Sequence, residues 1–306
     1  MSGFTYDLSK FIPFRDKEVC ERVRSIKKED ICRHPNPEFK IKIIEDPDDF
    51  YFQFALDIVT RIKNSLEEGR KLVMILPVGP TPQYKIAADM INNLKISCKH
   101  IYTFNMDEYA DQDGNTAPPD WEGSFQRAMW ENFFNLIDKD LRPPEDHIHF
   151  PTSKNISYYG KLIEDMGEAD ICYGGVGWAG HIAFWEPHLG YEFGDDLTSY
   201  MQAGPRIVEL HPMTIMQNAL HSFSGDWSWV PPKAATIGPS QIVKAKDRSF
   251  WLDGYLGGGV SWQRFIARLA AHGPVNTLVP ASILQKVPTT YNLLGGVADN
   301  CRISMR

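Results

Sequence analysis

The chain has 306 residues, of which 43% are hydrophobic and 23% charged, with a formal net charge of −7. This composition is ordinary for a globular protein, and the length suffices to bury a sizeable core. The acidic balance excludes a basic surface for nucleic acid or an anionic membrane, and no apolar run reaches membrane-spanning length. The beginning of the sequence lacks the pattern of a signal peptide. The five cysteines are scattered and form no CxxC pair, so we expect a reducing compartment and a cytoplasmic protein.

Short apolar runs alternate with segments of helical periodicity along most of the chain. In chain order we expect strand 40–44, helix 48–68, strand 72–76, helix 82–94, strand 101–104, a loop over 107–121, helix 124–137, helix 155–166, strand 169–173, strand 206–210, helix 213–221, strand 234–237, strand 249–253 and helix 261–271. This alternation predicts an α/β fold, a doubly wound and mostly parallel sheet with helices on both faces.

The first 39 residues are charged and show no strong period. We interpret residues 1–39 as an N-terminal extension that either packs on the body or on a neighbouring subunit, or forms a flexible tail. Residues 40–306 are expected to form a single α/β domain.

The segment 171–187 carries the most chemical information. A short apolar run is followed by four glycines, then by His181, and then by Glu186 just before Pro187. Glycines after a strand allow a tight turn or a close approach to the backbone. Open α/β sheets place their chemistry at such turns, so His181 and Glu186 are candidate catalytic residues. The alternative is a structural loop with a surface histidine.

Two further segments end strands in the same manner. Residues 101–104 run into the acidic pair Asp107 and Glu108. Residues 72–76 run into a loop of glycine and proline, and a helix is expected from about Pro82, preceded by Thr81 as its N-cap.

Together the three segments resemble the glucosamine-6-phosphate deaminase (isomerase) family, which is related to the 6-phosphogluconolactonases. Typical members carry LPTGGTP, TFNMDEY and GGxGxDGHIAFNEP in this order, and this chain has LPVGPTP, TFNMDEY and GGVGWAGHIAFWEP. Residues 124–134 and 275–285 are also similar to family segments. The resemblance covers about residues 40–290. It implies a sugar-phosphate isomerase or deaminase that converts an amino sugar phosphate to a ketose phosphate and ammonia, without metal or organic cofactor. We also expect a homo-oligomer.

The resemblance assigns roles to three residues. Asp107 would be the base that moves a proton between C1 and C2 of the open-chain sugar, which requires a carboxyl with a raised pKa. His181 would shuttle the proton that opens the sugar ring, since imidazole exchanges protons near pH 7. Glu186 would orient His181. The alternatives are a turn or cap aspartate and a structural histidine. We expect all three to line one pocket at the carboxyl ends of the strands, beside the loop 78–81.

The chain departs from the family pattern at the residue before Gly180. Ala179 replaces the family aspartate that orients the histidine, so His181 is left with Glu186. The loop also differs, because Val78 lacks the hydroxyl of the family threonine and Pro80 has no N–H to donate.

Two basic residues that bind phosphate in the family are missing as well. Leu220 stands in place of an arginine, and Gln263 in place of a lysine; Arg264 or His221 could substitute. We therefore expect a ligand that is unphosphorylated or carries its anion elsewhere, as a sugar acid does. The substrate-binding residues expected from the resemblance are Val78, Gly79, Thr81, Glu108, Gly175, Gly180 and Arg264.

Two other functions remain open. A sugar or sugar-acid binding protein without catalysis is favoured by Ala179 and Leu220, and a lactonase-like hydrolase follows from the wider relationship. Three further features rank lower: a metal site, a sugar-stacking platform and a glycine-rich ligand loop. Their residues are His147 with His149, Trp227 with Trp229, and Gly257 to Gly259.

Overall fold

A computed structural model describes residues 4–305 and contains a seven-stranded sheet. The strands are, in spatial order, β1 (Phe39–Ile44), β12 (Thr289–Leu294), β9 (Asp247–Leu252), β6 (Ile171–Gly174), β2 (Leu72–Leu76), β3 (Ile101–Asn105) and β5 (Ile148–His149). All neighbouring strands pair in parallel. From β2 the chain adds strands β3 and β5 toward one edge of the sheet, and from β6 it adds β9 and β12 toward the other, as in doubly wound sheets. The predicted α/β class is confirmed, although β12 was not among the strands expected from the sequence.

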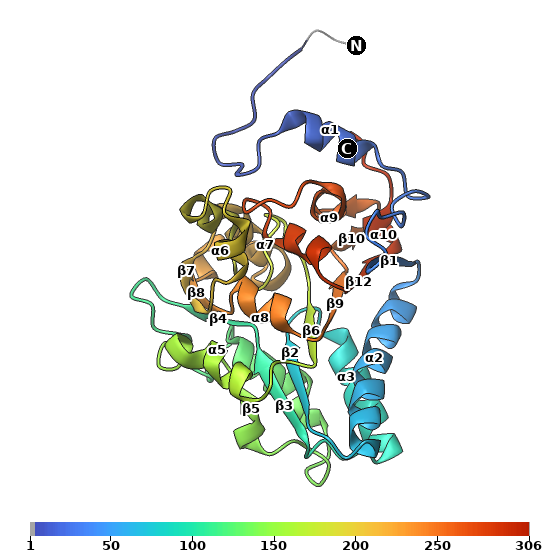
Figure 1. Ribbon diagram of the computed structural model, residues 1–306, viewed down its shortest axis with the longest axis vertical. Coiled ribbons are helices and arrows are strands. Elements are labelled where there is room, and N and C mark those ends of the chain that lie inside the picture. The colour runs from blue at the N-terminus through green and yellow to red at the C-terminus, as the bar shows by residue number, and fades with distance from the viewer. Residues whose placement is uncertain (1–3, 306) are drawn as a thin grey trace.

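The helices cover both faces of this sheet (Figure 1). On one face lie α2 (Pro47–Glu67) and α3 (Pro82–Leu94), and on the other lie α5 (Ile156–Asp165) and α8 (Pro239–Lys244). This division follows from right-handed crossovers, because the chain passes from β1 through β2 to β3 in one direction and returns through β6 and β9 in the other. Within residues 4–305, every helix is too short or too polar to cross a lipid bilayer.

A second, three-stranded antiparallel sheet corrects the prediction for two regions. It contains β4 (Asp107–Ala110), β8 (Lys233–Thr236) and β7 (Arg206–Glu209). The sequence placed 107–121 in a loop and the other two strands in the main alternating pattern. Short strands give no periodic signal of which sheet they join. The glycine run lies in a hairpin of β10 (Tyr255–Gly257) and β11 (Val260–Ser261).

Three of the remaining helices were expected from the sequence: α4 (Phe125–Asn132), α7 (Pro212–Ser222) and α9 (Arg264–His272). The other three, α1 (Lys17–Ser25), α6 (Leu197–Met201) and α10 (Gly295–Ala298), were not expected. The segment expected as helix 124–137 is shorter, because α4 ends at Asn132 and a 3-10 turn follows it at Phe134–Leu136.

The N-terminal segment contacts the body through α1, which packs against α9 (Figure 1). Val23 and Ile31 are fully buried there. The side chain of Arg268, buried in α9, donates to the carbonyl oxygen of Ile26 at 3.0 Å and to that of Ala298 at 2.7 Å. The segment before α1 exposes large side chains, among them Phe4 and Phe11.

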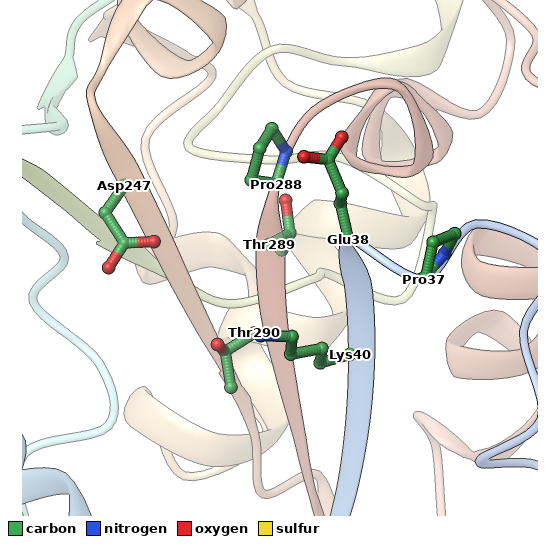
Figure 2. Close-up of a pocket in the computed structure, with 7 residues that line it drawn as sticks. All are labelled: Pro37, Glu38, Lys40, Asp247, Pro288, Thr289 and Thr290. Carbon is green, nitrogen blue, oxygen red and sulfur yellow. The ribbon is translucent and has the colours of Figure 1, made fainter.

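The amino ends of the strands carry a small hollow that differs from the site expected at their carboxyl ends. At the amino ends of β1, β12 and β9 lies a hollow of about 240 Å³, lined by Glu38, Lys40, Asp247 and Thr290 among others (Figure 2). Asp247 accepts from Arg61 Nη2 at 2.6 Å, so this carboxylate is already paired. The chemistry expected from the sequence lies at the opposite, carboxyl ends.

Candidate active site

A cavity of about 520 Å³ opens where β2, β6 and β9 end and β4 begins. The side chains of Asp107 and His181 line it, together with Val78, Gly79 and Thr81 of the loop that follows β2. Gly175 also lines it, just after β6. The structure therefore brings most of the residues expected from the sequence to one place, as the carboxyl ends of parallel strands do.

Asp107 is the first residue of β4 and is only 7% exposed. Burial raises the pKa of its carboxyl to about 8, and the neighbouring Glu108 adds to the shift. Desolvation disfavours the charged form, so this carboxyl can both hold and release a proton near neutral pH. A group of this kind suits a base that accepts a proton and returns it.

Glu108 has a different task from the substrate contact expected from the sequence. Its carboxylate accepts hydrogen bonds from Ser124 Oγ at 2.9 Å, Phe125 N at 3.0 Å and Gln126 N at 2.9 Å. It thus caps the N-terminus of α4, and it does not line the cavity. Successive strand residues point to opposite faces, so Asp107 and Glu108 cannot both face the same ligand.

His181 begins a relay of three buried side chains, with Thr214 and Glu186 behind it. His181 Nδ1 is 2.9 Å from Thr214 Oγ1, and Thr214 Oγ1 donates to Glu186 Oε2 at 3.0 Å. The direct distance from His181 Nδ1 to Glu186 Oε2 is 3.6 Å, so Thr214 bridges the two. The other oxygen of Glu186 accepts from the backbone N–H of His211 at 3.1 Å. Glu186 is fully buried and does not line the cavity, so it acts on His181 from behind.

This relay fixes the tautomer of His181. While Glu186 is ionised it can only accept, so the single Thr214 hydroxyl proton is donated to Glu186 and His181 Nδ1 carries the proton it shares with Thr214. Nε2 is then an acceptor. Burial, with smaller contributions from the nearby His211 and His221, lowers the pKa of His181 to about 3, so the ring is neutral. Burial likewise raises the pKa of Glu186 to about 8.

Gly177 is required by the position of this imidazole. A Cβ atom at residue 177 would lie 1.9 Å from His181 Nε2, closer than any side chain allows. The glycine-rich turn therefore serves a close approach of ring and backbone. Gly180, by contrast, does not line the cavity; its φ of +89° belongs to the turn itself.

The loop after β2 offers few hydrogen-bond donors. Three prolines, Pro77, Pro80 and Pro82, line the cavity without an N–H to donate. Thr81 stands at the N-cap of α3 as expected, but its side chain makes no capping hydrogen bond. The helix start is preserved while its capacity to bind an anion is reduced.

Neither Gln263, which replaces the family lysine, nor Arg264 brings a cation into the cavity. Gln263 lines the cavity, but it donates to the carbonyl of Val176 at 2.5 Å and accepts from Gly254 N at 2.8 Å. Arg264 lies outside the lining, and its guanidinium donates to the carbonyl of Gly296 at 2.8 Å. Adjacent helical residues point about 100° apart, so Arg264 cannot follow Gln263 into the cavity.

No lysine or arginine lines the cavity among residues 4–305. Its charged side chain besides Asp107 is Asp253, which directly follows β9 and accepts from the Tyr51 hydroxyl at 2.8 Å. Burial raises the pKa of Asp253. Asn218 adds a buried Nδ2 without a partner in the described part of the chain. His221 also lines the cavity, and burial lowers its pKa.

The lower-ranked candidates lie elsewhere. His147 stacks on Tyr102 and His149 on Phe104, and within residues 4–305 no three histidine, cysteine, aspartate or glutamate residues gather in a possible metal site. Trp227 and Trp229 are exposed and do not line the cavity.

Comparison with known proteins shows which family the chain belongs to. The sequence matches no protein-family model. A glucosamine-6-phosphate deaminase from Caenorhabditis elegans is 36% identical over 212 residues, which cover 67% of this chain and 73% of that protein. The chain belongs to the glucosamine-6-phosphate deaminase family. A second member, from Mannheimia succiniciproducens, is 32% identical over 241 residues, 76% of this chain and 80% of that protein.

Solved structures agree on the fold. A monomeric glucosamine-6-phosphate deaminase superposes with a TM-score of 0.70 at 23% identity, covering 85% of this chain and 99% of that one. A 6-phosphogluconolactonase from Thermotoga maritima gives a TM-score of 0.58 at 17% identity, covering 83% and 98%. At these identities the likeness concerns the fold alone.

Two residues of this family member escaped the sequence analysis. Thr214 is 33 residues from His181 and 28 from Glu186, so no local spacing connects them. Asp253 is the last residue of the predicted strand 249–253, and an acidic residue at a strand end is the kind of signal that singled out Asp107, so it could have been found in this way.

Proposed function

We propose that this chain catalyses proton transfer between adjacent carbons of an open-chain amino sugar, followed by release of ammonia, as a deaminase. The observation that carries this proposal is the pair of Asp107 and His181 facing one cavity. A buried carboxyl with a pKa of about 8 and a neutral imidazole with a free Nε2 can exchange protons with the same small ligand.

In this mechanism each residue has one task. His181 Nε2 accepts the proton of the C1 hydroxyl and passes it to the ring oxygen as the bond between C1 and the ring oxygen breaks, which leaves an aldehyde at C1 and a neutral imidazole. Asp107 then takes the proton from C2 and returns it to C1. Water adds to the C2 imine and ammonia leaves, so an amino aldose and water give a ketose and ammonia. Thr214 and Glu186 hold His181 in the required tautomer and orientation.

The test is the isosteric substitution Asp107→Asn, which keeps the shape and removes the base. Ammonia release and deuterium incorporation from D₂O into the product are measured with 2-amino hexoses and their 6-phosphates. General acid–base catalysis is typically worth about 10² to 10⁴ in rate, so turnover should fall by that factor. Asp89→Asn, on the exposed side of α3, is the matched control. Unchanged turnover in Asp107→Asn would contradict the proposal.

A binding protein without catalysis is the second candidate. Ala179 at the position of the family aspartate favours it, because one partner of His181 is absent. The same assay separates the two functions. A sugar that binds the wild-type chain but exchanges no deuterium and releases no ammonia would establish the binding protein.

A further inference from the structure

We propose that the substrate of this site is an unphosphorylated amino sugar, whose terminal hydroxyls are bound by Asp253 at the end of the cavity opposite Asp107. This inference rests on the proposed function and names its substrate class. Asp253 is then a specificity-determining residue and Tyr51 a positioning residue.

The two carboxyl groups stand at opposite ends of the cavity. Asp253 follows β9, and Asp107 follows β3 and begins β4. Strands β6 and β2 lie between β9 and β3, so three interstrand spacings separate the two strand ends. At the usual distance between neighbouring strands this is about 14 Å. A hexose fits between two side chains that approach it from such positions, with its reacting carbons at one end and its terminal hydroxyls at the other.

The cavity offers no cationic side chain to a phosphate group among the described residues. A phosphate monoester carries about −1.5 to −2 charges at neutral pH and requires cationic or N–H partners. Among the described residues the lining contains two aspartates and neither lysine nor arginine. Arg264, the nearest candidate in sequence, donates to the carbonyls of Gly296 and Gly259. A phosphate beside Asp253 would therefore face a carboxyl group with no cationic partner.

The backbone of the loop after β2 gives no substitute for the missing cations. An anion at a helix N-terminus is held by the first N–H groups and by nearby hydroxyls. Here Pro82 removes the first N–H of α3, Pro80 removes another from the loop, and Val78 supplies no hydroxyl. Gln83, also in the first turn, donates its side-chain amide to the carbonyl of Pro80. The loop is thus held together internally and offers few donors to a ligand.

Asp253 is instead suited to hydroxyl groups. A carboxylate accepts hydrogen bonds from sugar hydroxyls, and such charge-assisted bonds are stronger than neutral ones. The Tyr51 hydroxyl donates to Oδ2 at 2.8 Å and so fixes the orientation of the carboxylate. Trp251, Tyr255 and Trp262 also line this end of the cavity. Aromatic rings offer an apolar surface to the C–H groups of a sugar, so hydroxyl and C–H recognition occur together.

The same lack of cationic side chains argues against a sugar acid, which the sequence left open. Its carboxylate at the terminal carbon would face Asp253 in place of the phosphate. The altered loop left two ligand classes open, an unphosphorylated sugar and a sugar acid. Of these, the unphosphorylated sugar with neutral terminal hydroxyls is the one that we infer.

Calorimetry on the full chain tests the substrate class. Glucosamine, galactosamine and mannosamine are titrated, each beside its 6-phosphate. At least one free amino sugar should bind tenfold or more tightly than its own 6-phosphate. Asp253→Asn should weaken binding of the free sugar about tenfold and reduce this preference. Tyr51→Phe should also weaken binding of the free sugar and reduce its preference over the 6-phosphate, each by a smaller factor than Asp253→Asn. Asp89→Asn, which makes the same charge change at an exposed position, should shift neither.

The possible outcomes separate this inference from the proposed function. If a 6-phosphate binds as tightly as its free sugar or more tightly, and its turnover depends on Asp107, the substrate class is wrong while the deaminase function stands. If a free amino sugar binds with the expected preference but shows no Asp107-dependent turnover, the catalytic function fails and the recognition by Asp253 stands. If none of the six sugars binds, both are wrong.

Discussion

The two ends of the cavity differ in how far they keep the family pattern. At one end Asp107, His181 and Glu186 occupy the positions expected from the family motifs, and Thr214 joins the last two. At the other end the loop has lost donors, Gln263 is engaged with the backbone, and Asp253 adds a buried carboxyl group. In the function proposed above, reaction chemistry and ligand recognition therefore depend on separate sets of residues.

Among the variants that test this difference between the two ends, Thr214→Val should reduce turnover most. Valine keeps the shape but leaves His181 Nδ1 and Glu186 Oε2 without their shared partner. We expect a loss of about 10² in turnover of ring-closed substrate, since proton transfer by a misoriented imidazole is lost. An open-chain substrate analogue should show a smaller loss. Thr214→Ser keeps the hydroxyl and is the control; equal losses in both variants would exclude the relay.

The pH profile should identify the base at the reacting end. Asp107 must be ionised to accept the C2 proton, and its pKa is about 8, so about a tenth of the free protein is active at pH 7. We expect kcat/KM to rise about tenfold per pH unit up to about pH 8 and then to level off.

Glu186 has a similarly raised pKa, so a variant must separate the two groups. The rising limb should persist in Glu186→Gln and vanish from the residual activity of Asp107→Asn. If the rising limb instead vanished in Glu186→Gln and persisted in Asp107→Asn, it would report the ionisation of Glu186 and not that of Asp107.

Ala179→Asp should increase ring-opening-dependent turnover by less than tenfold. The added carboxylate would raise the pKa of His181 from its low value and favour the protonated ring. The gain is limited because Thr214 already occupies Nδ1. It should shrink with an open-chain analogue, and turnover at or below wild type with both substrates, in a folded variant, would show that the missing aspartate does not limit this site.

Thr81→Ala should have the smallest effect, at the recognition end. The Thr81 side chain makes no capping hydrogen bond, so its removal should change the free energy of unfolding by less than about 0.5 kcal/mol. Affinity for the free amino sugar should change less than threefold. Ser124→Ala offers the contrast, because Ser124 caps α4 and donates to Glu108, and its loss should cost about 1 kcal/mol in thermal unfolding.

The sequence predicted the fold through its periodicity and the site through its motifs. Long, strongly periodic elements such as α2 and α3 lie where expected, because apolar spacing and Pro82 mark them locally. The antiparallel sheet of β4, β8 and β7 was missed because sheet membership depends on contacts far apart in the chain.

The errors at individual site residues have equally local causes. Glu108 and Arg264 were expected at the ligand because they adjoin Asp107 and Gln263 in sequence. Neighbouring side chains diverge in both strands and helices, so each turns to a structural contact instead. Thr214 could not be predicted, since only the folded chain brings it between His181 and Glu186.

The buried guanidinium of Arg268 limits how the chain can be shortened. Its N–H groups are satisfied by carbonyl oxygens of Ile26 and Ala298, which belong to segments near opposite ends of the sequence. A protein trimmed to begin after Ile26 would leave a buried donor unpaired, at a cost of about 1 to 3 kcal/mol, and would uncover the face of α9 that Val23 now covers. The segment that looks most dispensable in the sequence thus ties both termini to one helix, and expression trials should keep it.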